Sequence, residues 1–155
     1  MIKLYETRLS GDAPIVLREK ARYNYGDRRK AYDDARLIHE MLVDVFEAET
    51  LPEEHLWLIC LNNKNRLQGV FEVSVGTKNY SVVGMKELFQ KALLANASNI
   101  VIAHNHPSGD STPSSEDMEV TKTVKDCGDM IGIKLLDHIV VGQGEYYSFH
   151  EQALI

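Results

Sequence analysis

Cysteine, long apolar runs, internal repeats and low-complexity tracts are rare or absent in this sequence, and these absences narrow the class of protein. The two cysteines, Cys60 and Cys127, are too few for a disulfide framework and lack the spacing of a cysteine-based zinc site. No apolar run reaches the roughly 20 residues that a membrane-spanning helix needs, and residues 1–5 lack the apolar core of a secretory signal. We therefore expect a cytoplasmic protein that has no membrane partner.

Charge is distributed unevenly along the 155 residues, a length that suits one ordinary domain. Residues 1–30 contain 8 Lys and Arg against 4 Asp and Glu, whereas residues 31–155 contain 9 against 19. We therefore predict a basic N-terminal arm, residues 1–30, followed by an acidic domain, residues 31–155. The acidic domain would repel a phosphate backbone, so any contact with nucleic acid is expected on the arm.

The second half of the arm combines basic and aromatic residues. Within residues 18–30, Arg and Lys side chains surround Tyr23 and Tyr25. Basic groups hold phosphates and aromatic rings stack on bases, so this stretch is a candidate for binding single-stranded nucleic acid. The same composition also suits a solvated arm, or an edge strand that packs on a partner subunit.

Hydrophobic periodicity in residues 31–155 switches between helical and strand patterns. Apolar residues recur at three- and four-residue steps between 31 and 48, which predicts an amphipathic helix, and the nearly continuous apolar run 56–61 predicts a central strand. The other expected elements are helices at 84–97 and about 115–130, and strands at 67–75, 99–103, 134–141 and 146–149. This order predicts an α/β fold with a mixed sheet and helices on both faces.

Two histidines end the apolar strand predicted at 99–103. Because side chains two apart on a strand point the same way, His104 and His106 would lie on one side, roughly 6.6 Å apart along the chain. Pro107 and Gly109 then start a loop that lets the chain return toward the two imidazoles. Two nitrogens placed in this way are able to converge on one cation.

The residue most suited to complete such a site is Asp117, near the start of the third predicted helix, where Ser114 is a good N-cap. Two imidazoles and one carboxylate suit Zn²⁺ and leave a fourth tetrahedral position for water, as in catalytic zinc sites. Simpler readings exist for each part. The histidine pair could hydrogen-bond a loop, and Ser114 with Asp117 could form only a capping box.

These residues carry a family resemblance. Residues 104–110 read His-Asn-His-Pro-Ser-Gly-Asp, and residues 113–117 read Pro-Ser-Ser-Glu-Asp. The string resembles the metal signature of the JAB/MPN metallohydrolases, the JAMM motif, and is most similar to its RadC-family version. A weaker likeness extends from about residue 51 to the C-terminus and includes residues 136–142, Leu-Asp-His-Ile-Val-Val-Gly.

The resemblance implies a three-layer α/β/α sandwich with a mixed sheet, related in plan to the cytidine deaminases. It also implies a glutamate, just before the strand that follows the first helix, that moves protons during catalysis. Glu54 stands at that place. The adjacent Glu53 would point the other way in an extended chain, and Glu72 is a more distant candidate. By the same resemblance, Ser114 supports the oxyanion that forms when water attacks an amide.

Three further polar residues have roles that the sequence leaves open. Asn105, between the two histidines, should face the opposite side of its strand and steady a loop. Asp110 could order the loop after the strand or accept a hydrogen bond from a ligand imidazole. His138 lies on an apolar strand, where a histidine is usually a hydrogen-bonded core or edge residue and not a ligand.

The function implied by the resemblance is a zinc metallohydrolase that cleaves a peptide or isopeptide amide in a protein or peptide substrate. Two rivals are a nucleic-acid-associated DNA-repair accessory protein of RadC type and a binding module with a vestigial site, as in metal-free MPN domains. A deaminase is excluded because its His-x-Glu and Pro-Cys-x-x-Cys motifs are absent from the sequence.

Overall fold

One mixed sheet organises the chain. The computed structural model describes residues 1–11, 13–27, 30–76 and 84–155. Within these residues, seven strands form a sheet in the order β2-β1-β4-β3-β5-β6-β7. The strands are β1 (Ile2–Ser10), β2 (Ala13–Tyr23), β3 (His55–Leu61), β4 (Leu67–Val75), β5 (Asn99–Asn105), β6 (Lys134–Val141) and β7 (Tyr146–Ser148). The helices are α1 (Ala35–Phe46), α2 (Met85–Leu94) and α3 (Ser115–Ile131).

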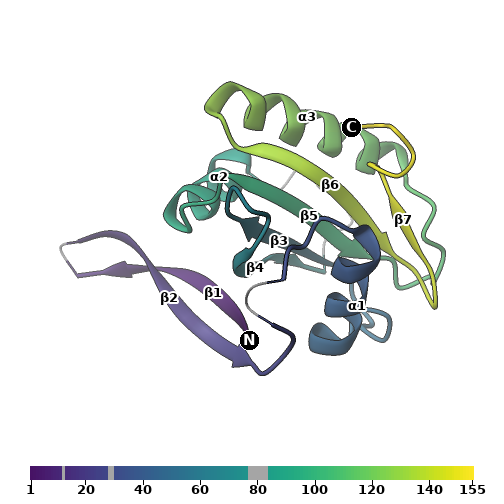
Figure 1. Cartoon of the computed structure of the whole chain (residues 1–155), viewed down its shortest axis with the longest axis horizontal. Helices are drawn as coiled ribbons and strands as arrows, with labels where there is room; N and C mark the ends of the chain where they lie inside the picture. Colours follow the sequence, from purple (N-terminus) through teal and green to yellow (C-terminus); the bar gives the residue numbers. More distant parts are fainter. Residues whose placement is uncertain (12, 28–29, 77–83) are drawn as a thin grey trace.

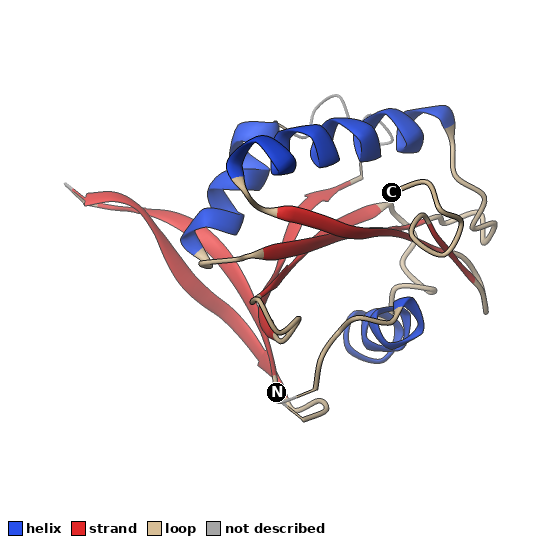
Figure 2. Ribbon diagram, turned by 45° about the horizontal axis from the view of Figure 1, so that its top comes forward, coloured by secondary structure: helices blue, strands red, loops and turns tan. Residues whose placement is uncertain are grey.

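Helices cover both faces of the sheet, with α1 on one face and α2 and α3 on the other (Figure 1, Figure 2). This arrangement explains the continuous apolar run of β3, because a strand buried on both faces needs apolar residues throughout. Trp57 and Ile59 belong to the core cluster under α1, whereas Leu56 and Leu58 belong to the cluster under α2 and α3. The predicted three-layer α/β/α sandwich is confirmed.

The central strand β5 fixes the position of the histidines. It pairs antiparallel with β3 and parallel with β6, so His104 lies between Leu56 on one side and Val140 on the other. Ile100 and Ile102 on the same strand pack under α2 and α3. By the two-residue alternation of strands, His104 shares their face, and its imidazole points toward α3.

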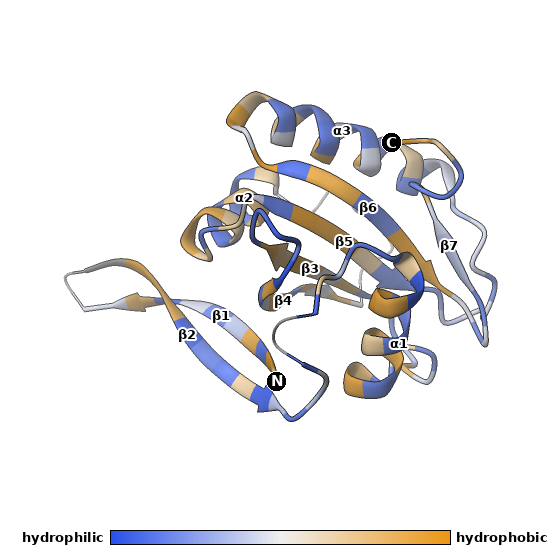
Figure 3. Cartoon of the chain, viewed as in Figure 1, coloured by the Kyte–Doolittle hydropathy of each residue, from blue (hydrophilic) through white to orange (hydrophobic). Residues whose placement is uncertain are grey.

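The strands β1 and β2 form a β-hairpin that belongs to the same sheet. β1 pairs antiparallel with β2, and it pairs parallel with β4 through Leu4 and Tyr5, opposite Val70 and Phe71. The outer part of the hairpin extends away from the body of the molecule (Figure 1). The half of β2 nearest the N-terminus label is mainly hydrophilic, in contrast to the apolar centre of the sheet (Figure 3). The sequence predicted a basic N-terminal arm here and did not identify these two strands.

The helices of the described part of the chain are all too short or too polar to cross a membrane. The longest, α3, spans 17 residues and carries charged residues along its length. Its buried residues mark the face that α3 turns toward the sheet. Met118 is 43% exposed, while Val120 and Val124 are buried against the sheet.

Candidate metal centre

The third helix begins with a capping box that fixes the carboxylate of Asp117. The Ser114 hydroxyl accepts a hydrogen bond from the Asp117 backbone N–H at 3.1 Å, and Asp117 Oδ2 accepts from the Ser114 N–H at 2.7 Å. The Ser114 hydroxyl also donates to Oδ2 at 2.8 Å. These reciprocal bonds satisfy helix N–H groups that otherwise lack partners, and they hold the Asp117 side chain in one rotamer.

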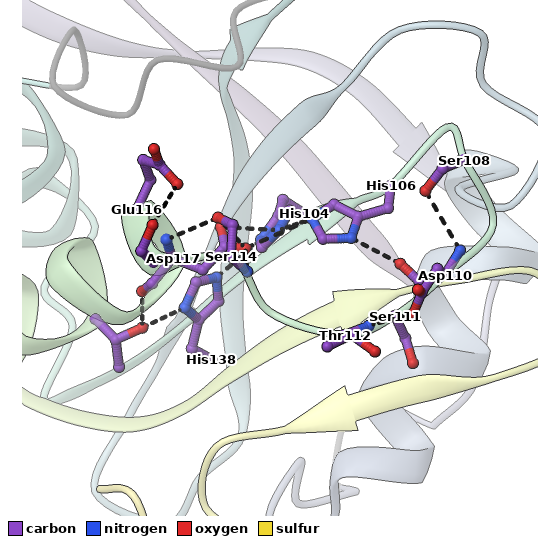
Figure 4. Close-up of polar contacts among 12 residues, drawn as sticks. His104, His106, Ser108, Asp110, Ser111, Thr112, Ser114, Glu116, Asp117 and His138 are labelled. Carbon is purple, nitrogen blue, oxygen red and sulfur yellow. Dashed lines mark hydrogen bonds and ion pairs between the residues drawn. The ribbon is translucent and has the colours of Figure 1, made fainter.

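The three residues expected to bind metal lie together where β5 ends and α3 begins (Figure 4). The two histidine Nε2 atoms are 3.0 Å apart. Asp117 Oδ1 lies 3.2 Å from His104 Nε2, and Asp117 Oδ2 lies 3.5 Å from His106 Nε2. Ligand atoms at zinc bonding distances of 2.0–2.1 Å in a tetrahedral site are about 3.3 Å from one another. The observed spacing therefore fits one small divalent cation.

Hydrogen bonding leaves unused acceptors at this corner. His106 Nδ1 lies 2.7 Å from the backbone oxygen of Asp110. A carbonyl only accepts, so Nδ1 carries the hydrogen and Nε2 of the neutral ring presents a lone pair to Asp117. Within the part of the chain that the structure describes, Asp117 Oδ1 is a buried oxygen without a hydrogen-bond donor. Such a group is costly unless a cation or donor satisfies it, and the donor set suits zinc.

The electrostatics of the corner favour positive charge. Burial alone would raise the pKa of Asp117, but the neighbouring imidazoles and the Ser114 N–H hold it well below its usual range, so the carboxylate is ionised. The hydrogen-bonding contact with Asp117 raises the pKa of His106 against the opposing effect of burial. The carboxylate thus attracts a proton to Nε2, the position where a metal ion would compete for the same lone pair.

The loop between His106 and Ser114 is anchored against the turn after β6. Gly142 allows this close approach, because a Cβ atom there would lie 2.5 Å from the Gly109 carbonyl oxygen. Gly109 itself has a φ of 85°, a conformation that glycine adopts without strain. Glu145 accepts hydrogen bonds from the backbone and hydroxyl of Ser111 at 3.0 and 2.9 Å. The loop is therefore held with the Asp110 carbonyl against His106.

Glu54 lies beside the metal corner, and Asn105 holds the segment that carries it. The Asn105 amide donates to the Glu53 carbonyl at 3.0 Å and accepts from the His55 N–H at 2.7 Å. These bonds flank Glu54 on both sides. Ligand atoms of Glu54, His104 and His106 all lie within 4.8 Å of one another. The expected steadying role of Asn105 is thus directed at the glutamate segment.

A groove of about 680 Å³ opens next to these groups, lined among others by Glu54, His106 and Ser114. Two exposed carboxylates, Glu53 and Glu116, also line it. Backbone N–H groups at the start of α3 lower the pKa of Glu116, so it is ionised at neutral pH. The described lining of the groove contains no Lys or Arg.

The other polar residues singled out in the sequence have different surroundings. Glu72 contacts His55 Nδ1 at 2.9 Å and Lys20 Nζ at 3.6 Å. The carboxylate of Asp110 accepts from the Thr112 N–H at 2.8 Å, so its backbone oxygen and not its side chain contacts His106. His138 is completely buried, and its Nε2 lies 2.9 Å from His104 Nδ1. The expectation that His138 is a hydrogen-bonded core residue is confirmed, while its partner His104 was not predicted.

The class of this protein is thus defined by an α/β/α sandwich in which two histidines at the end of β5 meet an aspartate in the first turn of α3. A sequence model of the RadC-like JAB domain matches residues 33–154. The chain therefore belongs to the RadC-like JAB domain family.

Curated relatives carry the name UPF0758 protein, which states no activity. One from Clostridium novyi (strain NT) is 48% identical over 109 residues, which cover 70% of this chain and 48% of that protein. Another, from Clostridium acetobutylicum, is 46% identical over 121 residues, covering 78% of this chain and 50% of that protein. The chain spans about half the length of the curated relatives it matches.

Proposed function

We propose that this chain is a zinc-dependent hydrolase that cleaves an amide bond in a peptide or isopeptide substrate. The residues that would hold Zn²⁺ are His104, His106 and Asp117. The observation that carries the proposal is the convergence of these acceptor atoms, 3.0 to 3.5 Å apart, around a buried carboxylate oxygen that lacks a donor among the described residues. An open groove and a further carboxylate lie beside them.

The chemistry divides between the cation and the chain. Zinc with an open fourth position lowers the pKa of a bound water to about 7 and polarises a carbonyl. Glu54 takes a proton from the attacking water and delivers it to the leaving nitrogen, because a base works through direct contact or through one water. Its ligand atoms lie within 4.8 Å of those of both imidazoles, which keeps it within reach of a water at the open position, while Asp117 Oδ1 lies 3.2 Å from His104 Nε2.

Ser114 supports the oxyanion in this proposal. Its hydroxyl hydrogen points to Asp117 Oδ2 in the structure, and the side chain also lines the groove. Rotation of the hydroxyl toward the groove would give a developing oxyanion one donor, while the Ser114 and Asp117 backbone bonds continue to cap the helix. A donor of this kind contributes about 2.7–4 kcal/mol to transition-state stabilisation in a protease.

The charge of the groove favours one class of substrate. Glu53 and Glu116 line an open groove whose described lining has no Lys or Arg. A peptide with Lys or Arg beside the cleaved bond would neutralise these carboxylates, whereas an acidic peptide would be repelled. We therefore expect the substrate to be a protein segment with basic residues near the scissile amide.

The nucleic-acid role expected for residues 18–30 has weaker support. Carboxylates on the hairpin already pair with its basic residues: Glu19 contacts Lys3 at 3.4 Å and Arg22 at 2.7 Å, and Glu6 contacts Arg8 at 2.9 Å. If the arm does bind single-stranded DNA, affinity should fall steeply with salt and vanish on deletion of residues 1–30. Binding that is insensitive to salt would exclude this mode.

The decisive test combines metal analysis with a substrate screen. Protein incubated with zinc should retain close to one ion per chain. Basic peptides and lysine-linked isopeptides should be cleaved by the wild type, and cleavage should stop on addition of a chelator. Glu54→Gln should retain zinc and lose cleavage. Protein that retains no zinc, or cleavage that persists in the chelator, would refute the proposal.

A further inference from the structure

A chain of short hydrogen bonds begins behind the metal corner and returns to it (Figure 4). His104 Nδ1, on β5, lies 2.9 Å from His138 Nε2 on β6. The other nitrogen of His138, Nδ1, lies 2.6 Å from the hydroxyl of Thr121 on α3. That hydroxyl lies 2.5 Å from the backbone oxygen of Asp117. The chain thus connects one candidate ligand to the backbone of another.

The direction of every bond in this chain follows from its last acceptor. The Asp117 carbonyl only accepts, so the single hydroxyl hydrogen of Thr121 is used there. The Thr121 hydroxyl must then accept a hydrogen bond from His138 Nδ1. The hydrogen of His138 is therefore on Nδ1, and Nε2 of His138 is unprotonated. A bare Nε2 accepts from His104, which places the hydrogen of His104 on Nδ1. His104 Nε2 therefore carries no hydrogen, and it lies 3.2 Å from Asp117 Oδ1 and 3.0 Å from His106 Nε2.

Burial removes other partners from this chain. His104 and His138 are fully buried, and Thr121 is only 2% exposed. The His138 ring stacks on Phe149, with ring centroids 4.8 Å apart and planes inclined by 14°. A flip of the His138 ring would disturb this packing and reverse both of its hydrogen bonds. The orientation and the tautomer of His138 are thus fixed by the same surroundings.

We infer that His138 and Thr121 are positioning residues that hold His104 in the tautomer whose unprotonated Nε2 is able to bind a metal. They touch neither substrate nor cation. In the opposite tautomer Nε2 carries a hydrogen, and this hydrogen would have to leave before a cation could bind there. The inference depends on the proposed function for its purpose, while the hydrogen-bond chain itself stands on the geometry.

Imidazole nitrogen chemical shifts test the tautomers without any use of activity. In the full chain, uniformly labelled with ¹⁵N and kept free of metal, both His104 and His138 should show a protonated Nδ1 and an unprotonated Nε2. Added zinc should then shift the Nε2 signal of His104 and leave His138 in the same tautomer. A protonated Nε2 on either residue in the metal-free protein would overturn the inference.

Two matched pairs of variants test the effect on zinc affinity, measured by competition with a chromophoric chelator. Thr121→Val keeps the shape of the side chain and removes the acceptor, whereas Thr121→Ser keeps the hydroxyl. His138→Leu removes the acceptor for His104, whereas the carbonyl of His138→Gln is able to replace it. We expect Thr121→Val and His138→Leu to bind zinc about 10- to 100-fold more weakly than the wild type. Thr121→Ser and His138→Gln should keep a zinc affinity close to that of the wild type.

A stability control separates positioning from general damage. Val124→Ala removes buried volume from the same helix, one turn beyond Thr121, and should lower the melting temperature without changing zinc affinity. Equal zinc affinity in Thr121→Val, Thr121→Ser and wild type would refute the inference and leave the proposed function intact. If the wild type binds no zinc, the proposed function fails, and the nitrogen shifts alone decide the inference.

Discussion

Glu72 on β4 and Asp117 on α3 both make contact with histidine, and the two contacts differ in what neutralises the carboxylate. Glu72 on β4 is partly exposed and has both His55 and a cation, Lys20, within 3.6 Å. Asp117 is fully buried, and its ion-pair partners among the described residues are two imidazoles, with no Lys or Arg. In the first contact, Lys20 already supplies the positive charge that the carboxylate needs. The second has an excess of acceptors, which is the signature of a cation site.

The comparison also shows why residue type alone is a poor guide to a site. Glu72 lies beside a histidine, as Asp117 does, yet at Glu72 the hairpin supplies a positive charge through Lys20. At Asp117 the chain supplies hydrogen bonds that keep the carboxylate ionised and in place. A carboxylate in water needs no further partner, whereas a buried one does.

The largest expected difference between the two contacts is in metal binding. Asp117→Asn retains an acceptor for the helix cap and removes the anionic ligand, so zinc affinity should fall by more than the roughly 10- to 100-fold caused by losing a partner of a ligand. Glu72→Gln should leave zinc affinity unchanged. Elemental analysis after gel filtration measures both. Stoichiometric zinc in Asp117→Asn would show that the zinc site lies elsewhere in the protein.

The next effect concerns the two adjacent glutamates. Once a cleaved substrate is identified, Glu54→Gln should lower kcat by about 100- to 10,000-fold, because it removes the proton acceptor. Glu53→Gln should lower kcat only slightly and act mainly through KM for basic peptides. Steady-state kinetics with zinc-loaded protein distinguishes them. The opposite ranking of the two variants would assign the base to Glu53.

A third effect is on stability. Zinc at 100 times its Kd should stabilise the fold by about 2.7 kcal/mol. For a chain of this length, this corresponds to a rise in melting temperature of roughly 5 to 10 °C. The rise should be absent in Asp117→Asn and preserved in Glu72→Gln, as measured by calorimetry with and without chelator. An equal rise in both variants would indicate zinc bound at another place.

The smallest effect is expected at the exposed contact. Lys20 is 51% exposed and Glu72 is 29% exposed, so their pairing is largely screened by water. Lys20→Ala should lower the free energy of unfolding by about 0.2–1 kcal/mol, less at high salt. Urea denaturation at low and high salt measures this. A loss of several kcal/mol would show that Lys20 holds the hairpin to the sheet.

Local pattern was sufficient to predict the body of the fold. The boundaries of β4 and β6 agree with the ranges expected from the sequence, and the predicted helices at 84–97 and 115–130 correspond to α2 and α3. These elements have a clear period, because each has a defined apolar face. The positions of Asp117 and the two histidines followed from the same local rules of strand alternation and helix capping.

The parts that were missed depend on contacts between distant residues. The hairpin joins the sheet through the pairing of Leu4 with Val70, and no local pattern encodes that pairing. Its charged residues alternate with partly buried ones, such as Leu17 and Ala21, so the stretch has the composition of a solvated arm. His138 meets His104 because β6 lies beside β5 after the α3 crossover, a register that only the folded chain sets.

Because of Asn105, the single strand β5 positions both the two proposed histidine ligands and the proposed base. Its neighbours in sequence, His104 and His106, form the cation corner, while its own amide grips the backbone on either side of Glu54. One residue step along a single strand therefore sets the spacing between proton acceptor and cation. A substitution at Asn105 should therefore disturb the proposed base and the cation corner together.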